Sequence, residues 1–220
     1  MSTRAVIICA GEASRWQNHT GVPKHLAVLN GERLIDRTTR LLYEQGVTDI
    51  HVVTKEYNPL YDTLYGSQSV VTVDYDTNAD ADKFLSSKHL WNTEGRTLVV
   101  YGDVYFTEQA MDRIVEYKTQ DWRLFCRPHG STITGTKWGE CFAQSFYPEH
   151  HQEHEQALHK IAQLYKDGHI KRCGGWEHYR EMCGVSKGFP QERMIVIDDL
   201  TDDIDYPDDY ERLKHATSNQ

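Results

Sequence analysis

Small residues and cations follow the first apolar run of the chain. Residues 6–16 read VIICAGEASRW, and the apolar part ends at Ala10-Gly11, shortly before Arg15. A loop of small residues lets backbone N–H groups approach phosphate oxygens, and arginine and lysine add charged donors. Lys24 follows in the segment PKHLAVLNG. The pattern predicts a phosphate-binding loop, although a tight turn with two surface cations would have the same spacing.

The elements that must position these residues alternate between strand and helix patterns. Strands are expected over 4–10, 49–54, 69–75 and 96–103, and helices over 33–46, 80–91 and 107–118. Such alternation favours an α/β fold with a largely parallel sheet, whose sites lie at the carboxyl ends of strands. The less regular second half predicts strands over 122–127, 140–147 and 193–199 and helices over 150–168, 174–184 and 206–216. No linker or repeat is evident, so residues 1–220 are expected to form one domain.

Composition narrows the class of protein. The chain has 220 residues, of which 39 % are hydrophobic, and a formal net charge of −9. Nucleic-acid binders usually carry a basic face, so no nucleic-acid partner is expected. No apolar run approaches the ~20 residues that span a bilayer, so no membrane partner is expected either. The N-terminus enters a strand pattern at once, without a signal-peptide pattern, which indicates a cytoplasmic protein.

The opening segment AVIICAGEASRW…GVPKHLAVLNGERLIDRTTRLL resembles the start of the nucleotidyltransferases that make activated sugars and related head groups. That family begins with a strand, then Leu-Ala-Ala-Gly-x-Gly-Thr/Ser-Arg, and a Pro-Lys follows. Here Ile8 to Arg15 and Pro23-Lys24 take these places, and Ala13 replaces the usual second glycine. The resemblance implies a three-layer α/β/α sandwich with a mostly parallel central sheet, of the nucleotide-diphospho-sugar transferase type.

Two later segments extend the resemblance. TLVVYGDVYF is similar to the family's strand ending in Gly-Asp, and DDIDYPDDYERL to its closing carboxylate motif. The resemblance implies that Asp103 and Asp205 hold a divalent metal, Mg²⁺ or alternatively Mn²⁺, which prefers oxygen ligands. A Gly-Asp after a strand is also a common turn, and the acidic stretch 198–209 also suits a solvated edge. Asp208 and Asp209 fit stabilisation of a helix N-terminus better than metal binding.

The implied reaction is transfer of a nucleoside monophosphate from an NTP to a small phosphorylated acceptor, with release of pyrophosphate. A sugar 1-phosphate is the first acceptor considered, and a phosphocholine- or polyol-phosphate-like acceptor the second. A glycosyltransferase with an NDP-sugar donor and a non-catalytic nucleotide sensor remain alternatives. Such glycosyltransferases usually carry Asp-x-Asp after the middle strand, and YGDVYF has a single aspartate. The chain is also compatible with a homo-oligomer.

The resemblance also implies site residues. Arg15 and Lys24 are the expected catalytic cations, and the expected nucleotide-binding residues are Ala10, Gly11, Glu12, Ala13, Ser14, Asn78 and Ser86. Helix capping and turn formation would explain the polar residues near 78 equally well. The segment 120–190 matches nothing in the family motifs and is expected to line the acceptor pocket, with Arg127, Lys137, Glu140 and Trp176 as candidate contacts.

Four histidines lie in or near one predicted helix, at positions 150, 151, 154 and 159. The spacing of His150 and His154 could hold a transition metal, but the glutamate of an HExxH arrangement is absent. A solvated helix face is therefore the expectation for this cluster.

Overall fold

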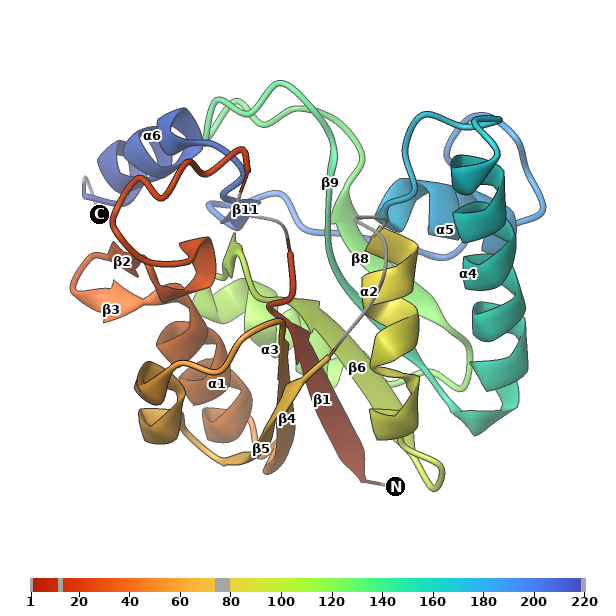
Figure 1. The fold of residues 1–220 in the computed structure, drawn as a ribbon, viewed down its shortest axis with the longest axis horizontal. Coiled ribbons are helices and arrows are strands. Elements are labelled where there is room, and N and C mark those ends of the chain that lie inside the picture. Colours follow the sequence, from red (N-terminus) through yellow and green to blue (C-terminus); the bar gives the residue numbers. More distant parts are fainter. Residues whose placement is uncertain (1, 12–13, 74–79, 219–220) are drawn as a thin grey trace.

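A computed structural model describes residues 2–11, 14–73 and 80–218 of the chain (Figure 1). Its main sheet has seven strands in the order β10-β8-β9-β6-β1-β4-β5. Strand β9 is antiparallel to β6 and β8, and all other neighbouring pairs are parallel. The bounds are β1 (Thr3–Ile8), β4 (Asp49–Thr54), β5 (Ser67–Thr72), β6 (Arg96–Tyr101), β8 (Arg123–Arg127), β9 (Glu140–Phe146) and β10 (Met194–Val196). The prediction of a mostly parallel sheet is confirmed.

Helices cover both faces of this sheet. Helices α1 (Leu34–Glu44) and α3 (Glu108–Glu116) pack on one face, and α2 (Asp80–Ser86), α4 (His151–Lys166) and α5 (Gly175–Met182) pack on the other (Figure 1). An apolar cluster lies on each face of the sheet, and β1 contributes to both. Ala5 and Ile7 point to the first face, and Val6 and Ile8 point to the second. This arrangement confirms the three-layer α/β/α sandwich.

Smaller elements stand at the carboxyl ends of the parallel strands. A two-stranded ribbon pairs β7 (Val104–Tyr105) with β11 (Asp202–Asp203), and a hairpin pairs β2 (Val28–Leu29) with β3 (Glu32–Arg33). Helix α6 (Pro207–Thr217) packs beside them on a third apolar cluster that includes Trp16, Ile204 and Leu213. Short 3₁₀ helices span Lys24–Leu26, Pro59–Thr63, Lys88–Leu90 and Pro148–His150. None of the helices in the described parts of the chain combines the length and apolar character needed to cross a membrane.

Most predicted elements occur with shifted ends, and the caps explain several of these ends. Thr107 caps α3 as expected, since its hydroxyl accepts a hydrogen bond from the Ala110 N–H at 3.0 Å. Gly46 follows α1 with a φ of +78°, a conformation that glycine adopts without strain. The helix predicted over 80–91 ends at Ser86, where Ser86 and Ser87 hydroxyls bond back to carbonyls within the helix.

The expectation of a solvated histidine face is wrong for His154. Its side chain is fully buried, its ring centroid lies 4.2 Å from that of Phe146, and its Nδ1 lies 3.2 Å from Nε2 of His178. The helical period places His154 on the same buried face of α4 as Leu158 and Ile161. His159, by contrast, has a side chain that is 65 % exposed.

This buried histidine pair predicts acid sensitivity of the fold. Burial lowers the pKa of His178 to about 3. Burial also lowers the pKa of His154 well below its usual value, and a positive charge on the neighbouring His178 would lower it further. The unfolded chain therefore binds more protons as the pH falls below about 6.5. We expect the free energy of unfolding to be unaffected by these groups above that pH and to decrease from there down to about pH 3.

Denaturant titrations at a series of pH values measure this effect. His178→Met should reduce the slope of the free energy of unfolding against pH by up to about 1.4 kcal/mol per pH unit. His159→Gln is the control, because it removes an exposed histidine from α4, the helix that carries His154. An unchanged slope in His178→Met would contradict the prediction.

Candidate active site

A pocket of about 520 Å³ opens at the carboxyl ends of β1 and β6. Its volume is in the range of small-molecule sites, about 300–1,000 Å³. Gly11, Ser14 and Arg15 line it from the loop after β1, and Asp103 from the segment after β6. Further walls come from α2, from the start of β9, from residues 171–178 and from the segment that contains β11.

A cluster of ion pairs centred on Lys24 forms one side of this pocket. The Lys24 ammonium contacts Asp103 Oδ2 and lies 2.9 Å from Asp205 Oδ1. Arg15 Nη1 donates to Asp205 Oδ2 at 2.5 Å. The structure thus brings together the two predicted cations and the two predicted carboxylates, although they lie in four separate segments of the sequence.

Burial and charge act in opposite directions on these groups. Burial lowers the pKa of Lys24, but the charges of Asp103 and Asp205 outweigh it, so the pKa lies above its usual value. Burial likewise raises the pKa of Asp103, but the charge and hydrogen bond of Lys24 outweigh it, and the net pKa is lowered. Because the Lys24 side chain is only 9 % exposed, water screens its charge poorly.

Close packing after β6 explains why a glycine precedes Asp103. A Cβ on Gly102 would collide with Sγ of Cys9 and lie 3.2 Å from the Ile8 carbonyl oxygen. The ribbon of β7 and β11 then joins the two carboxylate segments, since the Ile204 N–H donates to the Asp103 carbonyl at 3.0 Å. Asp103 and Asp205 are therefore fixed on neighbouring backbone segments.

Two further carboxyl groups, Glu140 and Asp203, face the same pocket. Burial and the negative charges of Asp205 and Asp202 raise the pKa of Glu140 to about 8. Burial and the charge of Glu140 raise the pKa of Asp203 well above its usual value. Asp203 is not among the site residues predicted from the sequence. Alternation along DDIDY would have shown that it shares a face with Asp205, because residues two apart in an extended segment point the same way.

The pocket lining also includes cations that were not predicted from the sequence. Lys83 of α2 is 6 % exposed and pairs with Asp80 at 2.8 Å. Lys171 and Arg172 line the pocket from the connection between α4 and α5, and no ion pair joins them to another described residue. No periodic pattern or motif marks this connection, so sequence reasoning had no signal for it.

The other predicted residues fall into three groups. Gly11, Ser14, Glu140 and Trp176 line the pocket, and the Trp176 indole donates to the Gly139 carbonyl at 2.9 Å. Besides Arg127, three do not line it: the Ala10 side chain is buried in the core, the Ser86 hydroxyl bonds to the Lys83 carbonyl, and the Lys137 side chain is exposed outside the pocket. Glu12, Ala13 and Asn78 lie outside the described residues.

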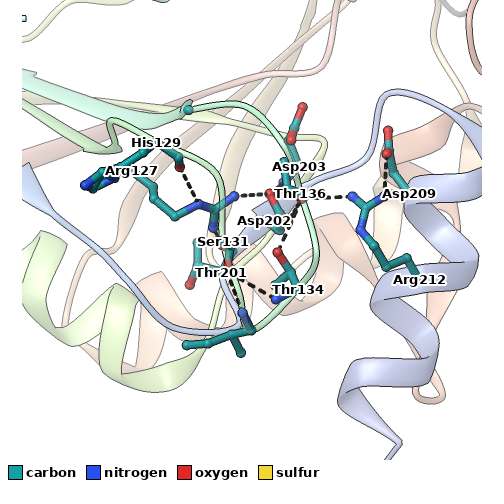
Figure 2. Close-up of polar contacts among 12 residues, drawn as sticks. Arg127, His129, Ser131, Thr134, Thr136, Thr201, Asp202, Asp203, Asp209 and Arg212 are labelled. Atoms are coloured by element: carbon teal, nitrogen blue, oxygen red, sulfur yellow. Dashed lines mark hydrogen bonds and ion pairs between the residues drawn. The ribbon is translucent and has the colours of Figure 1, made fainter.

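Arg127 needs a correction to the acceptor-binding role expected from the sequence. Its side chain is fully buried and lies outside the pocket lining. Figure 2 shows its guanidinium directed at protein acceptors, with Nη2 2.7 Å from Asp202 Oδ1 and Nη1 2.9 Å from the Thr201 carbonyl. With its donors engaged in the protein interior, Arg127 has no free face to offer an acceptor.

The donor set around Lys24 fits a cation that substrate phosphates share. Asp103 and Asp205 both contact the Lys24 ammonium, so two carboxylates converge on one cationic position. Mg²⁺ needs only one or two protein carboxylates when phosphate oxygens and waters complete its shell. Within the described ranges, no group of three or more His, Cys, Asp and Glu side chains forms a ready metal centre. The residues therefore suit a metal that enters with phosphates rather than an all-protein cage.

Comparisons with solved structures identify the fold. The chain is similar to the CTP:phosphocholine cytidylyltransferase LicC from Streptococcus pneumoniae, with 16 % identity, a TM-score of 0.64 and coverage of 99 % of this chain and 100 % of that one. It is similar to a putative glucose-1-phosphate thymidylyltransferase from Bacillus anthracis, with 11 % identity, a TM-score of 0.62 and coverage of 100 % and 96 %. For the inositol-1-phosphate CTP transferase from T. maritima the identity is 15 %, the TM-score 0.62 and the coverage 99 % and 96 %. At these identities the likeness shows the fold.

Sequence comparisons give the family. No curated protein matches the chain. The model of the MobA-like NTP transferase domain matches residues 5–172, which is most of the chain and includes the loop after β1, Lys24 and Asp103. With this match, and with the fold of known nucleotidyltransferases, the chain belongs to the MobA-like NTP transferase domain family and is a nucleotidyltransferase.

Proposed function

We propose that the protein transfers a nucleoside monophosphate from an NTP to a small phosphorylated acceptor and releases pyrophosphate. The convergence of Arg15, Lys24, Asp103 and Asp205 at one edge of the pocket is the observation that carries the proposal. In this proposal residues 1–220 form one nucleotidyltransferase domain, and about 120–190 form its acceptor-binding portion.

The chemistry asks for charge stabilisation rather than a strong base. A phosphate oxygen of the acceptor forms a bond to the α-phosphorus, and the bond from that phosphorus to the bridging oxygen breaks. Pyrophosphate leaves with the electron pair. Because the nucleophile is already an anion, the protein needs fixed cations and N–H donors that hold two polyanions together and stabilise the transition-state charge. Arg15, Lys24 and the backbone of the loop after β1 would supply them.

Asp103 and Asp205 would hold Mg²⁺, with Mn²⁺ as an alternative. When bound, the ion neutralises phosphate charge near the reacting phosphorus. Both carboxylates contact Lys24 in the described structure. Lys24 thus lies beside the residues that would hold the ion, where its ammonium could hold a phosphate oxygen of the substrate.

A sugar 1-phosphate is the acceptor that we propose first. Glu140 and Asp203 could accept hydrogen bonds from hydroxyl groups, and the Trp176 ring lines the same pocket. Lys171 and Arg172 could balance the acceptor phosphate, since no ion pair with a described residue engages them.

A cationic acceptor such as phosphocholine is the second candidate. The observation that favours it is the pair of acidic side chains, Glu140 and Asp203, which face the pocket beside Trp176. A bound ammonium group would stabilise the charged form of both carboxyl groups, whose pKa is raised by burial and by neighbouring negative charges, and is attracted by an aromatic face. The two candidates therefore differ in whether the acidic wall meets hydroxyl groups or a positive charge.

A matrix of four NTPs and several phosphomonoesters tests the proposal. Sugar 1-phosphates, inositol phosphate and phosphocholine would each be incubated with every NTP, and pyrophosphate and the product mass measured. We expect one acceptor class to yield pyrophosphate and a nucleoside-diphosphate product in equal amounts. Consumption of an NDP-sugar without pyrophosphate release from any NTP would overturn the proposal in favour of glycosyl transfer.

Metal dependence is a separate expected outcome. Activity should be lost in excess chelator and return with Mg²⁺ or Mn²⁺, because both ions prefer oxygen ligands. Asp103→Asn should raise the metal concentration that gives half-maximal activity, since it removes one charged ligand. Asp208→Asn is the matched control, because Asp208 is exposed and does not line the pocket. Full activity in excess chelator would rule out the metal role.

A further inference from the structure

The Arg127–Asp202 ion pair lies entirely inside the protein. The side chains are 0 % and 1 % exposed, and Arg127 Nη2 lies 2.7 Å from Asp202 Oδ1. A buried pair is costly to desolvate and stabilises a fold only when further hydrogen bonds satisfy both partners. Arg127 has such bonds to the carbonyl oxygens of Thr201, at 2.9 Å, and His129, at 3.3 Å. Each of the three guanidinium nitrogens of Arg127 therefore has a hydrogen-bond partner.

From Asp202 a chain of hydrogen bonds leads through Thr136 of the 128–139 loop to Arg212 of α6 (Figure 2). The Thr136 hydroxyl donates to Asp202 Oδ2 and accepts from Arg212 Nη2 at 2.9 Å. Arg212 Nη1 donates to Asp209 Oδ1 at 3.0 Å. The chain thus runs from β8 through the 128–139 loop to helix α6.

This chain ends at the backbone of a proposed active-site residue. Asp209 Oδ2 accepts from the N–H groups of Asp205, at 3.1 Å, and Tyr206, at 2.8 Å. The Asp205 side chain in turn holds Lys24 and Arg15. On its other side the same segment is held by β7. Residues 202–205 are therefore held on both sides. The Asp202 carboxylate contacts Arg127 and Thr136, and Asp203 lines the pocket.

Capping of α6 alone would not account for these contacts. A capping role requires only that Asp209 accept from the N–H groups that precede the helix. It requires neither Arg212 behind Asp209 nor the link through Thr136 to a buried pair. The 128–139 loop is also shaped around Arg212, because a Cβ on Gly135 would lie 3.0 Å from Arg212 Cδ, and Gly135 has a φ of +77°.

We infer that Arg127 and Arg212 are positioning residues for nucleotidyl transfer. Acting through Asp202, Thr136 and Asp209, they hold the 202–205 segment so that the Asp205 carboxylate meets Lys24 and the Asp203 carboxyl faces the acceptor. This inference rests on the proposed role of Asp205. In this inference the 128–139 loop positions residues 202–205 through Thr136 and does not itself bind the acceptor.

Paired variants in the middle of the chain test this inference. Thr136→Val keeps the side-chain shape and removes the hydroxyl, whereas Thr136→Ser keeps a hydroxyl. Arg212→Met removes the hydrogen bonds of Arg212 to Thr136 and to Asp209. Turnover and amide hydrogen exchange of peptides that cover 203–207 would be measured for each. We expect Thr136→Val and Arg212→Met to speed exchange at 203–207 and to lower kcat about 10-fold, as misplaced catalytic groups do.

Three comparisons keep the outcomes distinct. Thr136→Ser should return both readouts towards the wild type. Arg40→Met should change neither, because Arg40 lies on α1 and pairs with Glu32 of β3 and Glu44 of α1. Unchanged exchange at 203–207, or faster exchange with an unchanged kcat, would overturn the inference. If the wild type turned over no phosphomonoester, the proposed function would fail. The hydrogen-exchange comparison would still show whether these hydrogen bonds hold residues 203–207 in place.

Discussion

Lys24→Ala is expected to lower the turnover number by about 10² to 10³-fold, the usual effect of removing one preorganised charge contact. Lys24 is buried and is the only described cation that contacts both Asp103 and Asp205. Without its charge these carboxylates would repel each other and the phosphates of the NTP. The loss should appear mainly in kcat, because the contact strengthens as charge develops in the transition state.

The measurement is steady-state kinetics at saturating NTP, with a melting curve for each variant. Lys24→Met separates charge from packing, since it keeps the apolar stem that lies in the buried wall. Arg15→Ala should also lower turnover strongly, but less than Lys24→Ala, because its side chain is 52 % exposed and water screens its charge. Lys137→Ala, a change of an exposed lysine outside the pocket, should leave turnover unchanged. Near-normal activity of Lys24→Ala and Lys24→Met would show that the cluster is structural.

The meeting of Lys24 with Asp103 could be anticipated from the sequence for a physical reason. Parallel strands end at one edge of the sheet, so residues that follow β1 and β6 must approach each other wherever those strands are neighbours. The fold class followed from the same alternation of apolar strands and amphipathic helices. The roles of these residues in catalysis stay predictions, whereas their convergence is an observation.

The acceptor side of the pocket could not be predicted in the same way. Glu140 and Trp176 were selected by residue type and do line the pocket, but Lys171 and Arg172 lie in an irregular connection that no periodicity marks. Arg127 was misassigned because a residue's type does not reveal its partner. Asp202 lies 75 positions away in the sequence, and only the tertiary fold makes the pair. His154 was misassigned likewise, since its burial depends on the sheet that α4 covers.

Asp202→Ala is expected to be the most destabilising of the single changes considered, because it leaves the Arg127 guanidinium buried without its counterion. Breaking a buried pair in this way typically costs about 3–5 kcal/mol of the free energy of unfolding. Arg127 cannot turn to solvent, since its side chain is fully buried beneath the 128–139 loop and its other donors are held by carbonyl oxygens. Denaturant titration monitored by tryptophan fluorescence measures the loss.

Asp203→Ala is the matched control, since it removes the neighbouring carboxyl from the opposite face of the same short strand. Asp203 has no charged partner of opposite sign in the described structure, and Glu140, Asp205 and Asp103 repel it. Its removal should leave the free energy of unfolding unchanged or raise it. The double variant Arg127→Met/Asp202→Ala should lose less than the sum of its two single variants, because the second change removes the unpaired charge that the first one leaves. If Asp202→Ala were no more destabilising than Asp203→Ala, burial of the pair would not determine the stability of this segment. The hydrogen-bond chain to Asp205 would then lack its anchor.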